Sequence, residues 1–211
     1  MIEFNEYIKL TVSLFAITVP VAASAVYLGL TREYSHIDKL KTIGLTAVMF
    51  FSILTLFTFF GENILNFFSI SIEAFKVAGG AILFLSALQL VSSKTNISSS
   101  DNDEQSSSPM AIAIVPLAMP MLVGPGTIST VVIYTHMHPS LLHELLMVGV
   151  ILTNTLIIML VFWLTNHFGK LLSDNVTSIV NRLMGLIIAS MAVEFLLTGS
   201  ISHIQQNWVQ P

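Results

Sequence analysis

The stretch PLAMPMLVGPGTIST, residues 116–130, is apolar enough to enter a membrane but contains three prolines and two glycines. A proline removes a backbone hydrogen-bond donor and clashes with the preceding helical turn, so an α-helix does not run unbroken through Gly124-Pro125-Gly126. Inside a membrane, backbone groups released in this way are tolerated only where they line a cavity or meet other protein groups. The stretch therefore predicts a broken helix in the interior of a helical membrane protein.

The composition of the whole chain agrees with a membrane location. Of 211 residues, 54% are hydrophobic and only 9% are charged, and the mean hydropathy is +0.83. Soluble domains carry about 25% charged residues, so this chain has too few to cover a water-exposed surface. The absence of cysteine excludes a disulfide scaffold, and 8 basic against 12 acidic residues argue against nucleic-acid binding. We expect an integral membrane protein embedded in the lipid bilayer.

Long uncharged segments divide the chain into six predicted membrane spans, each near the length of about 20 apolar residues that a crossing requires. The period-two alternation of membrane β-barrels does not occur, so we expect an all-α, polytopic membrane helix bundle. The first span has an alternative interpretation as a signal peptide, because Ala23-Ser24-Ala25 resembles a cleavage site. The apolar run continues to Leu30, which favours a span. The predicted spans are residues 10–30, 42–60, 77–93, 110–134, 145–166 and 183–200.

The basic residues predict the orientation. Six of them follow the first, third and fifth spans, and only Lys9 and Lys76 lie on the other side. Since cytoplasmic loops carry the excess of Lys and Arg, both termini are expected outside a bacterial inner (plasma) membrane. The six are Arg32, Lys39, Lys41, Lys94, Lys170 and Arg182.

The two halves of the chain match each other at an offset of 105 residues. Because each half holds three spans, the second half must enter the membrane from the opposite side, as in the inverted repeats of secondary transporters. We predict repeat 1 over residues 1–93, a polar flexible linker over 94–109 and repeat 2 over 110–211, with broken helices 1 and 4 in one membrane domain. The matched pairs include Pro20 and Pro125, Ser24 and Ser129, Gly44 and Gly149, and Gly80 and Gly185.

The two proline sites predict a binding site for a small solute. The helix that restarts at Thr127 directs its first backbone N–H groups toward the middle of the bilayer, and a helix N-terminus favours an anion such as a carboxylate. The alternative is a kink that serves packing alone. The predicted substrate-binding residues are Pro20, Ser24, Gly124, Pro125, Gly126, Thr127 and Ser129.

Two further polar residues lie inside predicted spans. Glu194 interrupts the sixth span, and an ionisable group there is a functional hypothesis by default. We predict that it couples protons; the alternative is a glutamate near the outer interface. Asn154 lies in the middle of the fifth span, where it suits interhelical packing or a contact with substrate.

The loop after the fourth span is rich in histidine. His136, His138 and His143 with Glu144 have a spacing that suits a divalent metal, but no second cluster of ligands accompanies them. We expect solvated interfacial histidines, no metal site and no cofactor. No nucleophile–base pair, P-loop or dinucleotide fingerprint occurs, so the chain is not expected to be an enzyme or to use ATP.

Three segments resemble the signatures of the MarC family of six-span bacterial membrane proteins. They are FKVAGGAILFLSALQLV (75–91), AIAIVPLAMPMLVGPGTIS (111–129) and RLMGLIIASMAVEFLLTG (182–199). The resemblance implies a fold similar in outline to the LysE-type exporters, and some members are described as transporters of small neutral amino acids. The first span departs from the family pattern Asn-Pro-x-Gly, because Val19 precedes Pro20 and Ala22 follows Val21.

These observations predict a secondary transporter of small neutral amino acids or similar zwitterionic solutes, coupled to protons or sodium ions. The alternative is a non-transporting membrane protein that serves as a scaffold or partner subunit.

The natural absence of cysteine allows a test of the orientation. A single cysteine introduced as Ser100→Cys should react with an impermeant maleimide only from the cytoplasmic side, and His138→Cys only from outside. Labelling of Ser100→Cys in intact cells would reverse the predicted orientation.

Overall fold

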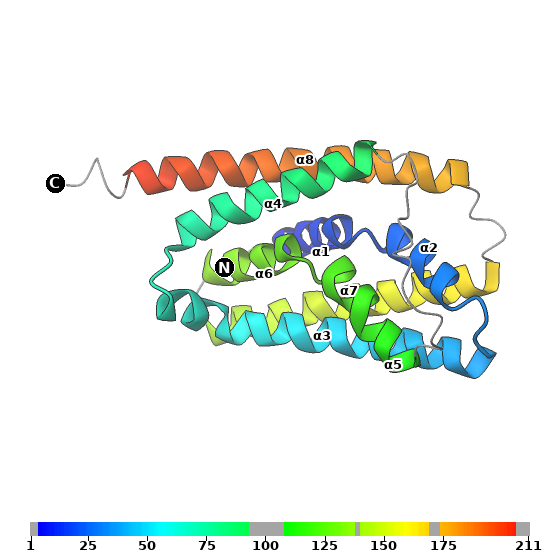
Figure 1. Ribbon diagram of the computed structural model, residues 1–211. Helices are drawn as coiled ribbons and strands as arrows, with labels where there is room; N and C mark the ends of the chain where they lie inside the picture. Colours follow the sequence, from blue (N-terminus) through cyan, green and yellow to red (C-terminus); the bar gives the residue numbers. More distant parts are fainter. Residues whose placement is uncertain (1–3, 93–107, 138–139, 169–173, 206–211) are drawn as a thin grey trace.

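The structure is a computed structural model that describes residues 4–92, 108–137, 140–168 and 174–205, and all regular structure in these ranges is helical (Figure 1). This confirms the predicted all-α class. Apart from Ser108 and Pro109, the predicted linker lies outside the described residues, as does His138. The elements are α1 (Phe4–Thr18), α2 (Pro20–Leu30), α3 (His36–Phe67), α4 (Ile72–Ser92), α5 (Pro109–Ile112), the kinked helical segment η1 (Ala113–Leu122), α6 (Pro125–Met137), α7 (Leu141–Phe168) and α8 (Asp174–Ile204).

Within the described ranges, five helical stretches are long and apolar enough to cross a membrane. They are α1 and α2 counted together, α3, α4, α7 and α8. The predicted fourth span is instead divided among α5, η1 and α6, because a proline disfavours the helical conformation of the residue before it. Val115 (φ −130°, ψ 121°) and Met119 (φ −128°, ψ 125°) are accordingly extended, each directly before a proline.

Helix α3 extends well beyond its predicted apolar span, and a polar N-cap stabilises its start. Helix α3 has 32 residues, whereas the prediction covered only residues 42–60. It begins after Ser35, whose side-chain oxygen accepts a hydrogen bond from the Asp38 backbone N–H at 3.2 Å. Such an N-cap satisfies one of the donors that a helix start leaves free, so the helix extends into the polar region.

The helices lie side by side in three layers (Figure 1). Helices α4 and α8 form one side, α3 and α7 form the other, and α1 and α6 lie between them. The most extensive contacts join α4 to α8 and α3 to α7, so each of these pairs contains one helix from each half of the chain. The fully buried side chains that fill the interior include Leu14, Tyr27, Phe50, Ile151 and Phe162.

Glycines bring α4 and α8 close together. A Cβ added to Gly80 would lie 2.9 Å from the Ala192 carbonyl oxygen, and one added to Gly199 would lie 2.9 Å from Val77 Cγ2. Since residue 77 faces residue 199 while residue 80 faces residue 192, the two helices run antiparallel. Small residues at such contacts are the usual means by which membrane helices approach one another.

We expect Gly80→Ala to destabilise the protein, because the new methyl group meets a backbone carbonyl that cannot move aside without shifting α8. The free energy of unfolding should fall by about 1–3 kcal/mol, as for other overpacked sites. Thermal unfolding in detergent measures the effect.

Gly44→Ala is the matched control, because a Cβ at Gly44 meets nothing within 4 Å. Its stability should rise by up to about 1 kcal/mol, the helix-propensity difference between the two residues. Equal responses at the two positions would show that close α4–α8 packing does not limit stability.

Candidate functional site

The first helix break lies between α1 and α2, at Val19. This residue has φ 40° and ψ 57°, in the left-handed region, and α2 begins at Pro20 directly after it. A β-branched residue in this conformation costs about 1–3 kcal/mol and persists only where the surrounding structure imposes it. Pro20 and Ser24 are both buried. The first break is therefore a strained point that the packing of the bundle holds in place.

The second break lies at Val123 and Gly124. Val123 (φ −108°, ψ 69°) ends η1, which confirms the predicted break. Helix α6 begins at Pro125, two residues before the predicted restart at Thr127, because proline is well tolerated in the first turn of a helix. Gly126 and Thr127 are buried, whereas Gly124 is half-buried and Pro125 is exposed. The predicted residues of the second half-site therefore point in different directions and do not all face the interior.

Hydroxyl groups beside both breaks donate within their own helices. A hydroxyl has one proton to donate, so these oxygens offer only lone pairs to a ligand unless they rotate. Binding of a carboxylate by these side chains therefore requires them to exchange an internal hydrogen bond for one to the solute. The bonds run from Ser24 Oγ to Val21 O (2.8 Å), from Thr127 Oγ1 to Leu122 O (3.1 Å) and from Ser129 Oγ to Pro125 O (2.8 Å).

Helix α4 packs closely over the start of α6. The space where Gly126 would carry a Cβ is occupied by the Leu83 side chain, and a Cβ on Gly79 would lie 2.5 Å from Ser129 Cβ. Gly126 therefore allows the close approach of α4. Sequence analysis did not identify Leu83, because nothing in an apolar run indicates which leucine covers a distant glycine.

Asn154 is a buried polar side chain that, unlike these hydroxyls, has one polar atom without a hydrogen-bond partner. It is 0% exposed. Its Nδ2 donates to the Val150 carbonyl oxygen at 3.0 Å, while its Oδ1 is buried and has no hydrogen-bond partner. Buried side-chain acceptors are nearly always paired, so this oxygen requires an explanation.

Glu194 lies on the exposed side of α8. Gln89, its counterpart in the first half, is exposed on α4. The described part of the chain thus does not enclose this carboxylate, and its neighbours would be lipid or another molecule. Proton coupling through Glu194 stays a prediction.

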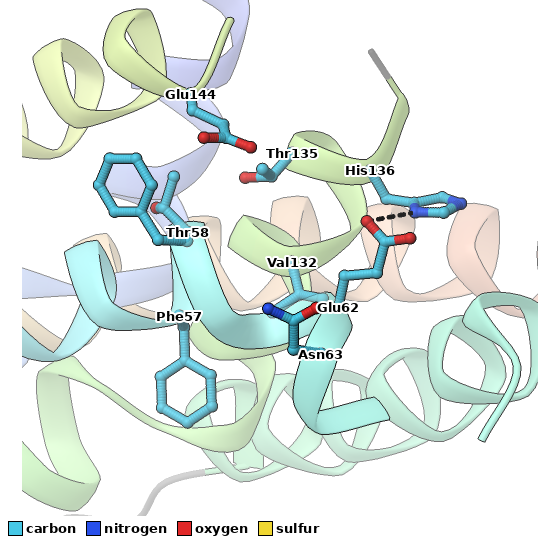
Figure 2. A pocket seen from close by; sticks show the side chains of 9 residues that line it. Phe57, Thr58, Glu62, Asn63, Val132, Thr135, His136 and Glu144 are labelled. Atoms are coloured by element: carbon cyan, nitrogen blue, oxygen red, sulfur yellow. Dashed lines mark ion pairs between the residues drawn. The ribbon is translucent and has the colours of Figure 1, made fainter. Parts of the chain in front are cut away.

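A polar cavity of about 190 Å³ lies between the C-terminal ends of α3 and α6 and the start of α7 (Figure 2). Figure 2 shows Glu62 and His136 facing each other across its edge, with Glu62 Oε2 3.4 Å from His136 Nδ1. Glu144 points toward the cavity from α7, near Thr135. Within the described residues, no three His, Cys, Asp or Glu side chains gather as a metal site requires.

His143 is buried, which differs from the expected solvated position. Its Nε2 lies 2.9 Å from the Tyr134 carbonyl oxygen, and its Nδ1 lies 2.8 Å from the Tyr7 hydroxyl. Because a carbonyl only accepts, Nε2 donates to it, and neutral Nδ1 then accepts the Tyr7 proton. Both ring nitrogens are thus used to join α1, α6 and α7.

Apolar helices long enough to cross a bilayer, packed around two interior helix breaks, define a multi-pass α-helical integral membrane protein. Comparison with known families is more specific. The chain belongs to the MarC family: the model of the MarC family integral membrane protein matches residues 4–204.

Relatives occur in bacteria and archaea and align over nearly their whole length. The chain is 32% identical over 204 residues to the UPF0056 membrane protein YvbG of Bacillus subtilis, covering 93% of this chain and 94% of the relative. It is 29% identical over 200 residues to the UPF0056 membrane protein YhcE of Escherichia coli, covering 93% of each. It is 30% identical over 195 residues to the UPF0056 membrane protein PH0760 of Pyrococcus horikoshii, covering 92% and 94%. No solved structure gives a significant match.

Proposed function

We propose that this protein is a secondary transporter of small neutral amino acids or similar zwitterionic solutes across the inner membrane. The observation that carries the proposal is the pair of helix breaks, 105 residues apart, each directly followed by a helix that begins on a proline. Interrupted helices in the membrane interior are the parts from which many transporters build their substrate sites.

The proposed topology has six crossings, with α5, η1 and α6 together forming the fourth. Two features of the packing support an inverted repeat over residues 1–93 and 110–211. The most extensive contacts pair corresponding helices of the two halves, α4 with α8 and α3 with α7, and α4 and α8 run antiparallel. With the basic loops in the cytoplasm, both termini lie outside.

The proposed site holds the two ends of a zwitterion by uncharged groups. The first N–H groups of α6, at Gly126 and Thr127, suit the solute carboxylate, assisted by the positive end of the helix dipole. The Thr127 and Ser129 hydroxyls contribute after rotating away from their own helix, and Pro20 and Ser24 form the opposing half-site. We propose transport rather than catalysis because no residue in either half-site can act as a general base.

One observation favours the second candidate, a non-transporting scaffold or partner subunit. Leu83 already fills the space over Gly126, so this glycine serves helix packing whether or not a solute binds. In that case the breaks would only shape the bundle, and no flux would be observed.

Uptake of labelled glycine, alanine, serine and threonine into proteoliposomes tests the proposal. We expect the wild type to transport at least one of these solutes, and Thr127→Val to reduce its uptake by about tenfold, the effect of one hydrogen bond of about 1–1.5 kcal/mol. Thr153→Val is the matched control, since Thr153 is exposed on α7 and its hydroxyl donates to the Gly149 carbonyl oxygen. Absence of flux from folded protein would favour the scaffold.

The same assay tests proton coupling through Glu194. With an inward proton gradient imposed, wild-type uptake should rise above its level at equal pH, and Glu194→Gln should lose that rise while keeping the basal rate. A sodium gradient is the parallel condition that identifies the alternative coupling ion. A full gradient response in Glu194→Gln would assign coupling to another group.

A further inference from the structure

We propose that Asn154 is a substrate-binding residue that faces the first helix break and accepts a hydrogen bond from the ammonium group of the solute. The proposal rests on the proposed transport function and adds to it a specific recognition element for one end of the zwitterion. It follows from the position of Asn154 along α7 and from the state of its side-chain oxygen.

Contacts at both ends fix how α7 lies against α1 and α2. Near the start of α7, His143 Nδ1 is 2.8 Å from the Tyr7 hydroxyl of α1. Near its end, the Phe162 ring stacks on the Tyr27 ring of α2, with the centroids 5.2 Å apart. Residue numbers increase in the same direction along both segments, so α7 runs parallel to α1 and α2.

Counting from these two contacts places Asn154 level with the break. At about 1.5 Å per residue, Asn154 lies about 16 Å along α7 from His143 and about 12 Å before Phe162. The same distances counted forward from Tyr7 and back from Tyr27 reach Thr18 and Val19. The two counts, made from opposite ends, agree on the point where α1 ends and α2 begins.

Asn154 also lies on the face of α7 that meets these helices. Eleven residues at about 100° each return to within about 20° of the direction of His143, which contacts α1. Ile151 and Ile158, one turn to either side of Asn154, are buried in the core cluster that joins α7 to Leu14 of α1, Ala23 of α2 and Phe50 of α3, so the direction of His143 decides the face. The amide therefore projects between α7 and the break.

The side-chain oxygen of Asn154 has no hydrogen-bond partner, whereas the hydroxyl of the neighbouring Thr155 has one. Thr155, the next residue, donates its hydroxyl to the Ile151 carbonyl oxygen at 2.7 Å. Asn154 Oδ1 has no hydrogen-bond partner although the residue is 0% exposed. An unpaired buried acceptor destabilises the folded state, and a leucine at this position would avoid that cost. A ligand donor that pairs with the oxygen during transport accounts for an asparagine at this position.

The chemistry at this point suits an uncharged zwitterion-binding site. Helix α2, of 11 residues, begins here, but Pro20 has no N–H, and the N–H groups of Ala22 and Ala23 both donate to the Val19 carbonyl oxygen. The carboxylate therefore stays with the first N–H groups of α6, as proposed above. The amide oxygen of Asn154 offers the acceptor that the ammonium group requires. Because neither group is ionised, the pair favours a solute without net charge over a cation or an anion.

The experiment compares L-alanine with propionate, which is alanine without its ammonium group. Binding is measured by the shift in thermal unfolding of the purified full-length protein, and uptake is measured in proteoliposomes. We expect Asn154→Leu to lower the apparent affinity for alanine by about 10- to 100-fold, the effect of a hydrogen bond to a charged group, and to leave that for propionate unchanged. Without ligand, its melting temperature should equal or exceed that of the wild type.

Two further variants control the interpretation. Asn154→Asp keeps an oxygen at the same reach and should retain the preference for alanine over propionate. Thr155→Val removes a hydroxyl that is bonded within its own helix and should leave alanine affinity unchanged. If Asn154→Leu does not fold, Asn154→Ala, which only removes atoms, replaces it in the same comparison.

The outcomes separate the inference from the proposed function. Wild-type transport with unchanged alanine affinity in Asn154→Leu or Asn154→Ala would overturn the role of Asn154 and leave transport intact. A lower melting temperature with unchanged alanine affinity would identify a packing role instead. If the wild type neither binds nor transports alanine or the other three amino acids, the proposed function fails and the role of Asn154 fails with it.

Discussion

The structure depends on how the chain accommodates prolines within apolar helices, where unpaired backbone groups are costly. Hydrocarbon requires each backbone polar group to be bonded within the protein, whereas a proline prevents the residue before it from continuing a helix. At Val19, Val115 and Met119 the residue that precedes a proline departs from helical geometry, and at Gly124 the chain passes from η1 into α6. The other helices partly cover Val19 and Gly124, which are half-buried, whereas Val115 and Met119 stay exposed.

Close packing at glycine supplies much of that shielding. Leu83 covers Gly126 at the start of α6, and Gly79 allows α4 to approach Ser129 one turn further on. Gly80 and Gly199 then bring α8 against the other side of α4. In a bilayer, where burial of apolar surface does not drive helices together, such contacts are a main source of stability. They also connect the second break to the outer helix pair.

Two kinds of buried polar group bear on the proposed solute site. The hydroxyls of Ser24, Thr127 and Ser129 donate to carbonyls of their own helices and thus are stable without a ligand. The oxygen of Asn154 has no such partner, because the amide nitrogen makes the bond to its own helix and the oxygen then points elsewhere. In such a site the hydroxyls need no ligand, so only the Asn154 oxygen lowers the stability of the ligand-free protein. The same oxygen gains a hydrogen bond when a solute binds.

The sequence by itself determined the membrane class, five of the long apolar helical stretches and the two breaks, because these follow from local hydropathy and from the geometry of proline. It did not determine which side chains meet across the bundle. The burial of His143 between Tyr7 and Tyr134, the exposure of Glu194 and the complete burial of Asn154 each depend on the register between helices far apart in the chain. That register is decided by tertiary packing, since an apolar helix carries little local information about which of its faces will meet which neighbour.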